Sequence, residues 1–118
     1  MTLYEKYGGF ATIHTIVKEF YKDLLAEDDL KPYFARVSMD FLIQHQTDFL
    51  SQLLGGPIQY TGRTLREAHQ VLRIPKAHFD LVAQLLQENL EDAGVETDDV
   101  QTIMEIVAST LPDIVYTD

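Results

Sequence analysis

The sequence predicts a single all-α domain that spans residues 1–118. Three observations lead to this prediction. Apolar residues recur at intervals of three and four, as they do on one face of an amphipathic helix. No segment alternates apolar and polar residues in the manner of a strand. Glycine and proline separate the apolar stripes. A chain of 118 residues with 46% hydrophobic content is large enough for one core and too small for two.

The first half of the chain predicts two long helices and two short helical pieces. Residues 3–6 favour a single helical turn that ends at Gly8-Gly9. Residues 12–27 form the first long helix, because their apolar side chains keep helical spacing over four turns. A short turn follows at residues 30–34, and the second long helix covers residues 40–54.

The second half predicts a short helix followed by two longer ones. Thr64 and Glu67 have the spacing of a capping box at the start of a two-turn helix over residues 65–72. A helix this short is not stable alone, so other elements must pack against it. A further helix runs from Pro75 to Gly94, and the last runs from Thr97 to Pro112.

Composition excludes several classes of protein. Nine basic residues against nineteen acidic ones give a formal charge of −10, which argues against binding to nucleic acid or to anionic membranes. The absence of cysteine excludes disulfides, thiolate catalysis and cysteine-based metal sites. No apolar run approaches the roughly 20 residues of a membrane span, and the N-terminal residues lack the apolar segment of a signal peptide. We therefore expect a cytoplasmic protein.

Three polar side chains occupy positions where a core is expected. Tyr21 and His69 each lie within the apolar stripe of a predicted helix, and Gln46 lies near the middle of the stripe of another. Burying an unpaired amide costs a few kcal/mol. One interpretation is structural: Tyr21 and Gln46 bond to each other, and His69 bonds to a backbone carbonyl. The other is a central cavity in which a neutral imidazole binds a metal.

The order and spacing of several short motifs resemble the group I truncated haemoglobins, small globins whose two-over-two helical sandwich encloses a haem. The matching motifs are Leu3-Tyr4-Glu5-Lys6, Gly8-Gly9, Phe20-Tyr21, Phe34-Ala35, His45-Gln46, Gly55-Gly56, Gly62-Arg63, Arg66-Glu67-Ala68-His69 and His78-Phe79-Asp80. The resemblance implies that His69 is the proximal ligand of the haem iron, and that Tyr21 and Gln46 stabilise a ligand on the opposite side. The other residues implied to bind the cofactor are Phe20, Phe34, Leu42, His45, Phe49, Arg63, Leu65, Arg66, Phe79, Val82 and Val107.

The resemblance also implies a function. The cofactor is expected to be haem b without a covalent link, since residues 112–118 contain no histidine. The expected ligands are O2, NO, CO or similar small molecules, and NO dioxygenation with an unidentified reductase is a plausible enzymatic consequence. In an alternative, His45 is a sixth iron ligand and the protein serves redox or peroxide chemistry. A third interpretation, from another class, is a cofactor-free helical adaptor.

Overall fold

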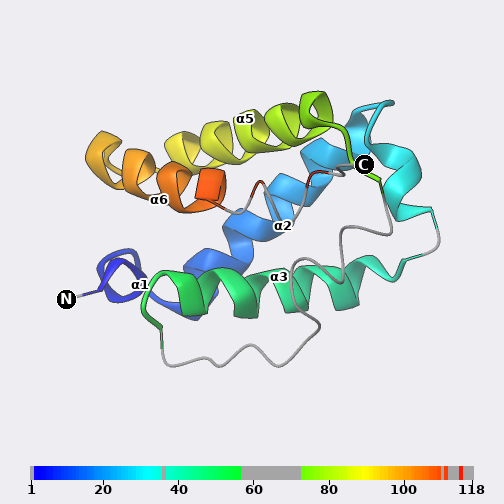
Figure 1. Cartoon of the computed structure of the whole chain (residues 1–118). Coiled ribbons are helices and arrows are strands. Elements are labelled where there is room, and N and C mark those ends of the chain that lie inside the picture. The colour runs from blue at the N-terminus through cyan, green and yellow to red at the C-terminus, as the bar shows by residue number, and fades with distance from the viewer. Residues whose placement is uncertain (1, 36, 57–72, 110, 112–114, 116–118) are drawn as a thin grey trace. The chain divides into compact units, whose positions relative to one another are not determined.

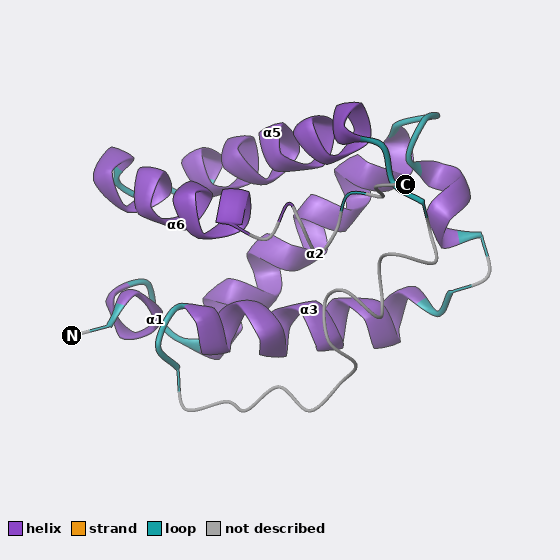
Figure 2. Ribbon diagram, viewed as in Figure 1, coloured by secondary structure: helices purple, strands orange, loops and turns teal. Residues whose placement is uncertain are grey.

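The computed structural model describes residues 2–35, 37–56, 73–109, 111 and 115, and every regular element within these ranges is helical (Figures 1 and 2). The contacts of the chain divide it into two compact units, Met1–Gly62 and Arg63–Asp118. The described part of the chain contains one isolated bridge, between Ile74 and Val115 of the second unit. No helix among the described residues is long and apolar enough to cross a membrane.

The first unit begins with α1, Leu3–Lys6, which confirms the predicted single turn. The Thr2 side chain caps it by accepting a hydrogen bond of 3.1 Å from the Glu5 backbone N–H. The Tyr4 N–H donates to the Leu54 carbonyl at 3.1 Å, which ties α1 to the residue that ends the helix over Met39–Leu53. A Cβ at Gly56 would lie 2.7 Å from the Tyr4 ring, so this close approach requires glycine.

Helix α2, Phe10–Ala26, begins two residues before the predicted start. The earlier start follows from Gly9, whose φ of +76° places the turn directly before Phe10. Its buried face consists of residues at helical spacing, which are Ile13, Ile16, Val17, Tyr21 and Leu24. A 3-10 turn, η1 (Lys31–Phe34), then packs against α2. Leu30, 1% exposed, anchors the segment that joins them.

Helix α3, Met39–Leu53, packs against α2 within the first unit. Ser38 caps it by accepting a hydrogen bond from the Phe41 N–H at 3.4 Å. Its most buried residues are Thr47 and Ser51, both 0% exposed. Thr47 satisfies its hydroxyl by donating to the Ile43 carbonyl at 2.7 Å. The Ser51 hydroxyl, in contrast, is buried without a hydrogen-bond partner among the described residues.

The second unit contains a hairpin of two helices, α5 (Lys76–Asp92) and α6 (Thr97–Ser109), which pack against each other. Pro75 was predicted in the first turn of this helix, but it occupies the N-cap position directly before Lys76 and makes no side-chain capping bond. Gly94, with φ of +87°, makes the tight turn between the helices. The core of the hairpin is apolar and comprises Phe79, Leu85, Leu86, Leu90, Val95, Val100 and Ile103. The predicted helix over residues 65–72 and its capping box lie outside the described residues.

Candidate functional site

Tyr21 on α2 is the most buried of the predicted polar site residues that the structure describes, with 6% of its surface exposed. The Phe34 ring meets it edge-on, with centroids 5.7 Å apart and an angle of 88° between the planes. The ring of the neighbouring Phe20 is tilted against it, with centroids 5.3 Å apart. Burial raises the pKa of the Tyr21 phenol well above its ordinary value. A phenol is neutral at physiological pH even without this shift, so the Tyr21 hydroxyl can donate a hydrogen bond.

The hydroxyl of Tyr21 and the amide of Gln46 both lack a partner among the described residues. Neither group makes a hydrogen bond with another residue of this part of the chain, and no such bond joins the two to each other. The structural interpretation, in which they satisfy each other, therefore receives no support from the described residues. Among the described residues, the one fully buried side-chain polar atom without a partner is Ser51 Oγ on α3, so the Tyr21 hydroxyl and the half-buried Gln46 amide keep some accessible surface. An uncommitted hydroxyl inside an apolar environment is thus well placed to bond to a ligand.

The face of α3 that lies away from Thr47 and Ser51 is apolar but only partly covered. At about 100° per residue, the stripe predicted from the sequence lies roughly 150° around the helix from the line of Thr47 and Ser51. Its members are half-buried or, for Leu53, 38% exposed; they are Leu42, Gln46, Phe49 and Leu53. This apolar stripe is therefore less covered than the line of Thr47 and Ser51, and its larger side chains keep exposed surface.

His45 lies at the edge of this partly covered stripe and stacks with an aromatic neighbour. The Phe41 ring is 4.1 Å from the His45 ring, at an angle of 33°. Phe41 itself is 60% exposed, so it gains little by burial in the described structure. Sequence reasoning did not select Phe41, although its position four residues before His45 on one helix was the available signal.

The remaining predicted site residues fall into two groups. In the second unit, Phe79 is 6% exposed and belongs to the core of the hairpin, while Val82 and Val107 are half-buried. Four predicted residues lie outside the described part of the chain: Arg63, Leu65, Arg66 and His69. The roles of these four stay predictions, as does the cavity that would unite Tyr21, Gln46 and His69.

The geometry of the first unit defines a class of protein. A half-covered apolar stripe on α3 and two donors without partners among the described residues suit a small helical protein that holds a largely apolar group carrying a polar ligand. The family model described as "Bacterial-like globin" matches residues 2–115 of the chain. The chain belongs to the bacterial-like globins and, within them, to the truncated haemoglobins of the two-over-two helical fold.

Relatives and solved structures agree with this assignment. A group 1 truncated haemoglobin of Tetrahymena thermophila is 37% identical over 112 residues, which cover 95% of this chain and 93% of the relative. The crystal structure of the truncated haemoglobin of Tetrahymena pyriformis in its Fe(III) form superposes with a TM-score of 0.92 at 34% identity, covering 99% of this chain and 100% of that one. The 2/2 haemoglobin of a Synechococcus species, solved in the cyanomet state with covalently attached haem, superposes with a TM-score of 0.90 at 33% identity, covering 97% and 98%.

Proposed function

We propose that the chain binds haem b without a covalent link, with His69 as the proximal iron ligand, and that it binds O2 and other diatomic molecules reversibly. Membership of a globin family implies haem binding. The observation that carries the ligand-binding part is that the Tyr21 side chain is largely buried while its hydroxyl has no hydrogen-bond partner among the described residues. A polar group is stable in such a place when a bound ligand completes its hydrogen bond.

The residues of α3 fit the cofactor that the family implies. The half-covered stripe offers aromatic and aliphatic surface to a flat macrocycle, and its burial by the cofactor would remove the exposure that remains at Leu53. When bound, the iron supplies the site at which a diatomic molecule is held. Tyr21 and Gln46 would donate hydrogen bonds to that molecule, whereas Leu42 offers no donor. Stabilisation of about 1–3 kcal/mol corresponds to about 5- to 150-fold in dissociation constant.

Titration of the purified chain with haemin tests the proposal directly. The expected result is a strong Soret band that saturates at one haemin per chain, followed by reversible spectral change when the reduced protein meets O2. A chain that is colourless and takes up no added haemin would support the cofactor-free adaptor instead.

A second candidate function follows from the position of His45. This side chain is half-buried, one residue before Gln46, and next to the same apolar stripe. If it ligates the iron, an incoming ligand must first displace it, and the observed affinity falls by the fraction of the open state. The protein would then suit redox or peroxide chemistry better than oxygen binding.

The variant His45→Ala distinguishes the two candidates. If His45 is a sixth ligand, the ferric and ferrous spectra should change from six-coordinate low-spin to five-coordinate or water-bound forms, and binding of CO to the reduced protein should become faster. The matched control is His14→Ala, which removes a half-buried imidazole from α2, beside Phe10. Identical coordination in the wild-type and His45→Ala proteins would exclude His45 as a ligand.

We also propose that the same site carries out NO dioxygenation. This reaction would require a reductase, not yet identified, that returns the iron to its ferrous form. The donors of α2 and α3 would hold O2 while NO reaches it. Nitrate production after NO is added to the O2-saturated ferrous protein is the direct measurement. Release of the NO unchanged would leave reversible ligand binding as the function.

The raised pKa of Tyr21 makes a separate prediction about stability. Above about pH 10, the unfolded phenol ionises while the buried one stays neutral, so the free energy of unfolding falls as pH rises. The slope from this one group is about 1.4 kcal/mol per pH unit. The variant Tyr21→Phe should lose that part of the alkaline destabilisation, as measured by urea unfolding at pH 8, 10 and 11. Equal pH profiles for the two proteins would show that the phenol is hydrated in the folded state.

A further inference from the structure

The charge of the chain is distributed very unevenly along the sequence. All nine lysine and arginine residues lie in residues 1–76, where nine acidic residues balance them. Residues 77–118 contain ten acidic residues and neither lysine nor arginine. The whole formal charge of −10 therefore belongs to the last 42 residues, which include most of α5 and all of α6.

Two acidic side chains of the hairpin border a groove and have no cationic partner among the described residues. Asp80 pairs with Lys76 at 2.8 Å, at the very start of α5. Further along the hairpin, Glu91 and Glu105 form no ion pair with any residue in the described ranges. Like charges concentrated in this way repel each other and lower the stability of the folded state. The hairpin accordingly produces a strongly negative potential that attracts cations.

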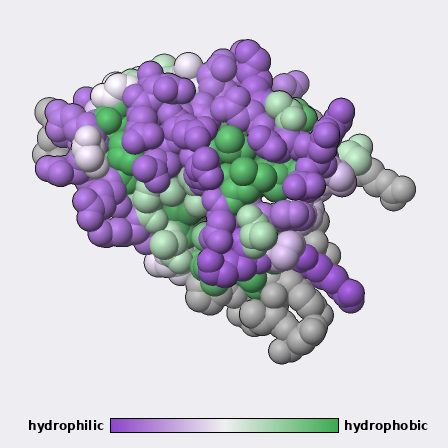
Figure 3. Space-filling view, turned by 90° about the horizontal axis from the view of Figure 1, so that it is seen from above, coloured by the Kyte–Doolittle hydropathy of each residue, from purple (hydrophilic) through white to green (hydrophobic). Residues whose placement is uncertain are grey.

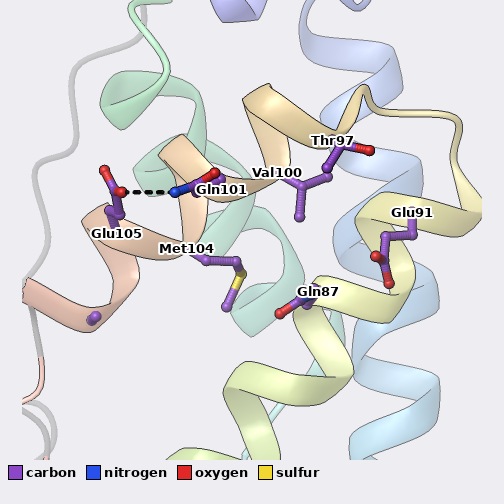
Figure 4. A pocket seen from close by; sticks show the side chains of 8 residues that line it. Gln87, Glu91, Thr97, Val100, Gln101, Met104 and Glu105 are labelled. Carbon is purple, nitrogen blue, oxygen red and sulfur yellow. Dashed lines mark hydrogen bonds between the residues drawn. The ribbon is translucent and has the colours of Figure 1, made fainter.

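A shallow groove of about 370 Å³ lies between α5 and α6 on this acidic hairpin (Figure 4). Its apolar surface comes from α6, where Val100 is 4% exposed, Met104 is half-buried and Ala108 is exposed. The side chains of Val100 and Met104 point toward α5, while Glu91 and Glu105 lie on opposite helices at its border (Figure 4). Seen from above, the molecule presents apolar (green) residues surrounded by hydrophilic (purple) ones (Figure 3).

We propose that this groove is a docking site for a cationic segment of another protein, in which an apolar side chain lies between lysine or arginine residues. The apolar side chain would cover Met104 and Ala108, and the cationic groups would meet Glu91 and Glu105. Charge complementarity selects this partner over nucleic acid or anionic lipid, both of which the hairpin repels. The small size of the groove predicts weak, rapidly exchanging binding that depends on salt. This site is independent of the proposed haem function.

A synthetic peptide serves as the probe, with two leucines flanked on both sides by lysines and a fluorescent label for anisotropy measurements. The 118-residue chain is titrated in at low and at physiological ionic strength. Saturable binding is expected, about tenfold weaker at the higher salt concentration. The double variant Glu91→Gln/Glu105→Gln should weaken binding about fivefold.

The charge-matched control is Asp28→Asn/Asp29→Asn, which removes two exposed carboxylates from the charge-balanced part of the chain. It should change binding by less than about twofold. Equal losses for the two double variants would overturn the proposal, because they would show attraction to net charge alone. Circular dichroism verifies that each variant keeps its helix content.

The apolar half of the proposal has its own test. Met104→Ser should weaken peptide binding about threefold or more, whereas Met104→Leu should preserve it. A peptide in which serine replaces both leucines should bind no more tightly than the original peptide binds to Met104→Ser. If the serine peptide binds as well as the leucine peptide, or if sedimentation shows that a second copy of the chain covers the groove, the proposal is wrong.

Discussion

Replacing His69 with glycine is expected to abolish tight haem retention. The proposed proximal imidazole is the protein's bond to the iron, and the other expected contacts, which are apolar packing and the side chains of Arg63 and Arg66, would not bind the metal. Altering a group that only supports a metal ligand typically costs about 10- to 100-fold in affinity, so removal of the ligand itself should exceed that range. Transfer of haem to an excess of apomyoglobin, followed at the Soret band, gives the rate of loss.

Exogenous imidazole separates a lost ligand from a misfolded chain. Added at millimolar concentration, it should occupy the space left by His69→Gly and restore a histidine-ligated spectrum and slower haem loss. The matched control is His78→Gly, which removes a half-buried imidazole from the first turn of α5. Haem loss from His69→Gly at the wild-type rate would show that another residue ligates the iron.

The second large effect is expected from Tyr21→Phe, which should accelerate O2 release about tenfold, the equivalent of one hydrogen bond. The substitution preserves the ring and its edge-on contact with Phe34, so the packing of α2 against η1 should persist. The phenol is neutral at physiological pH, and burial raises its pKa further; no described residue accepts a hydrogen bond from it. Stopped-flow displacement of O2 by CO measures the rate.

A double-mutant cycle with Gln46→Leu determines whether the two donors act on the same ligand. If both bond to it, the double variant should release O2 at a rate that differs from the product of the single effects. Tyr33→Phe in η1 serves as the control for loss of a phenol that is not predicted to face the ligand. An unchanged rate in Tyr21→Phe would remove Tyr21 from the ligand's surroundings.

Much of the helical architecture was predictable because helix signals are local. The cap at Thr2, the cap at Ser38 and the turn at Gly94 each act within a few residues, and all three helix boundaries lie close to the predicted ones. The start of α2 was missed by two residues because Gly9 adopts a positive φ that the sequence alone does not reveal. Membership of the truncated haemoglobins was likewise apparent from short motifs spread along the chain.

The burial of each helix face could not be predicted in the same way. The periodicity of α3 indicates an apolar stripe, yet the buried line passes through Thr47 and Ser51. Hydrophobicity is a property of each side chain by itself. Close packing between two helices depends also on the size and shape of the residues that face each other across the interface. The same limit applied to α6, where Met104 belongs to the apolar stripe but lines an open groove rather than the core.

Residue order alone therefore dictates where the helices start and stop, their apolar periodicity, and the concentration of negative charge in residues 77–118. The tertiary structure decides which stripe of α3 is buried and which stays partly exposed, and it leaves the Tyr21 hydroxyl without an acceptor among the described residues. The physical reason is that the two features depend on residues at different separations along the chain. Helix formation depends on neighbours three or four residues away, whereas burial depends on the shape of an element that is distant in the chain.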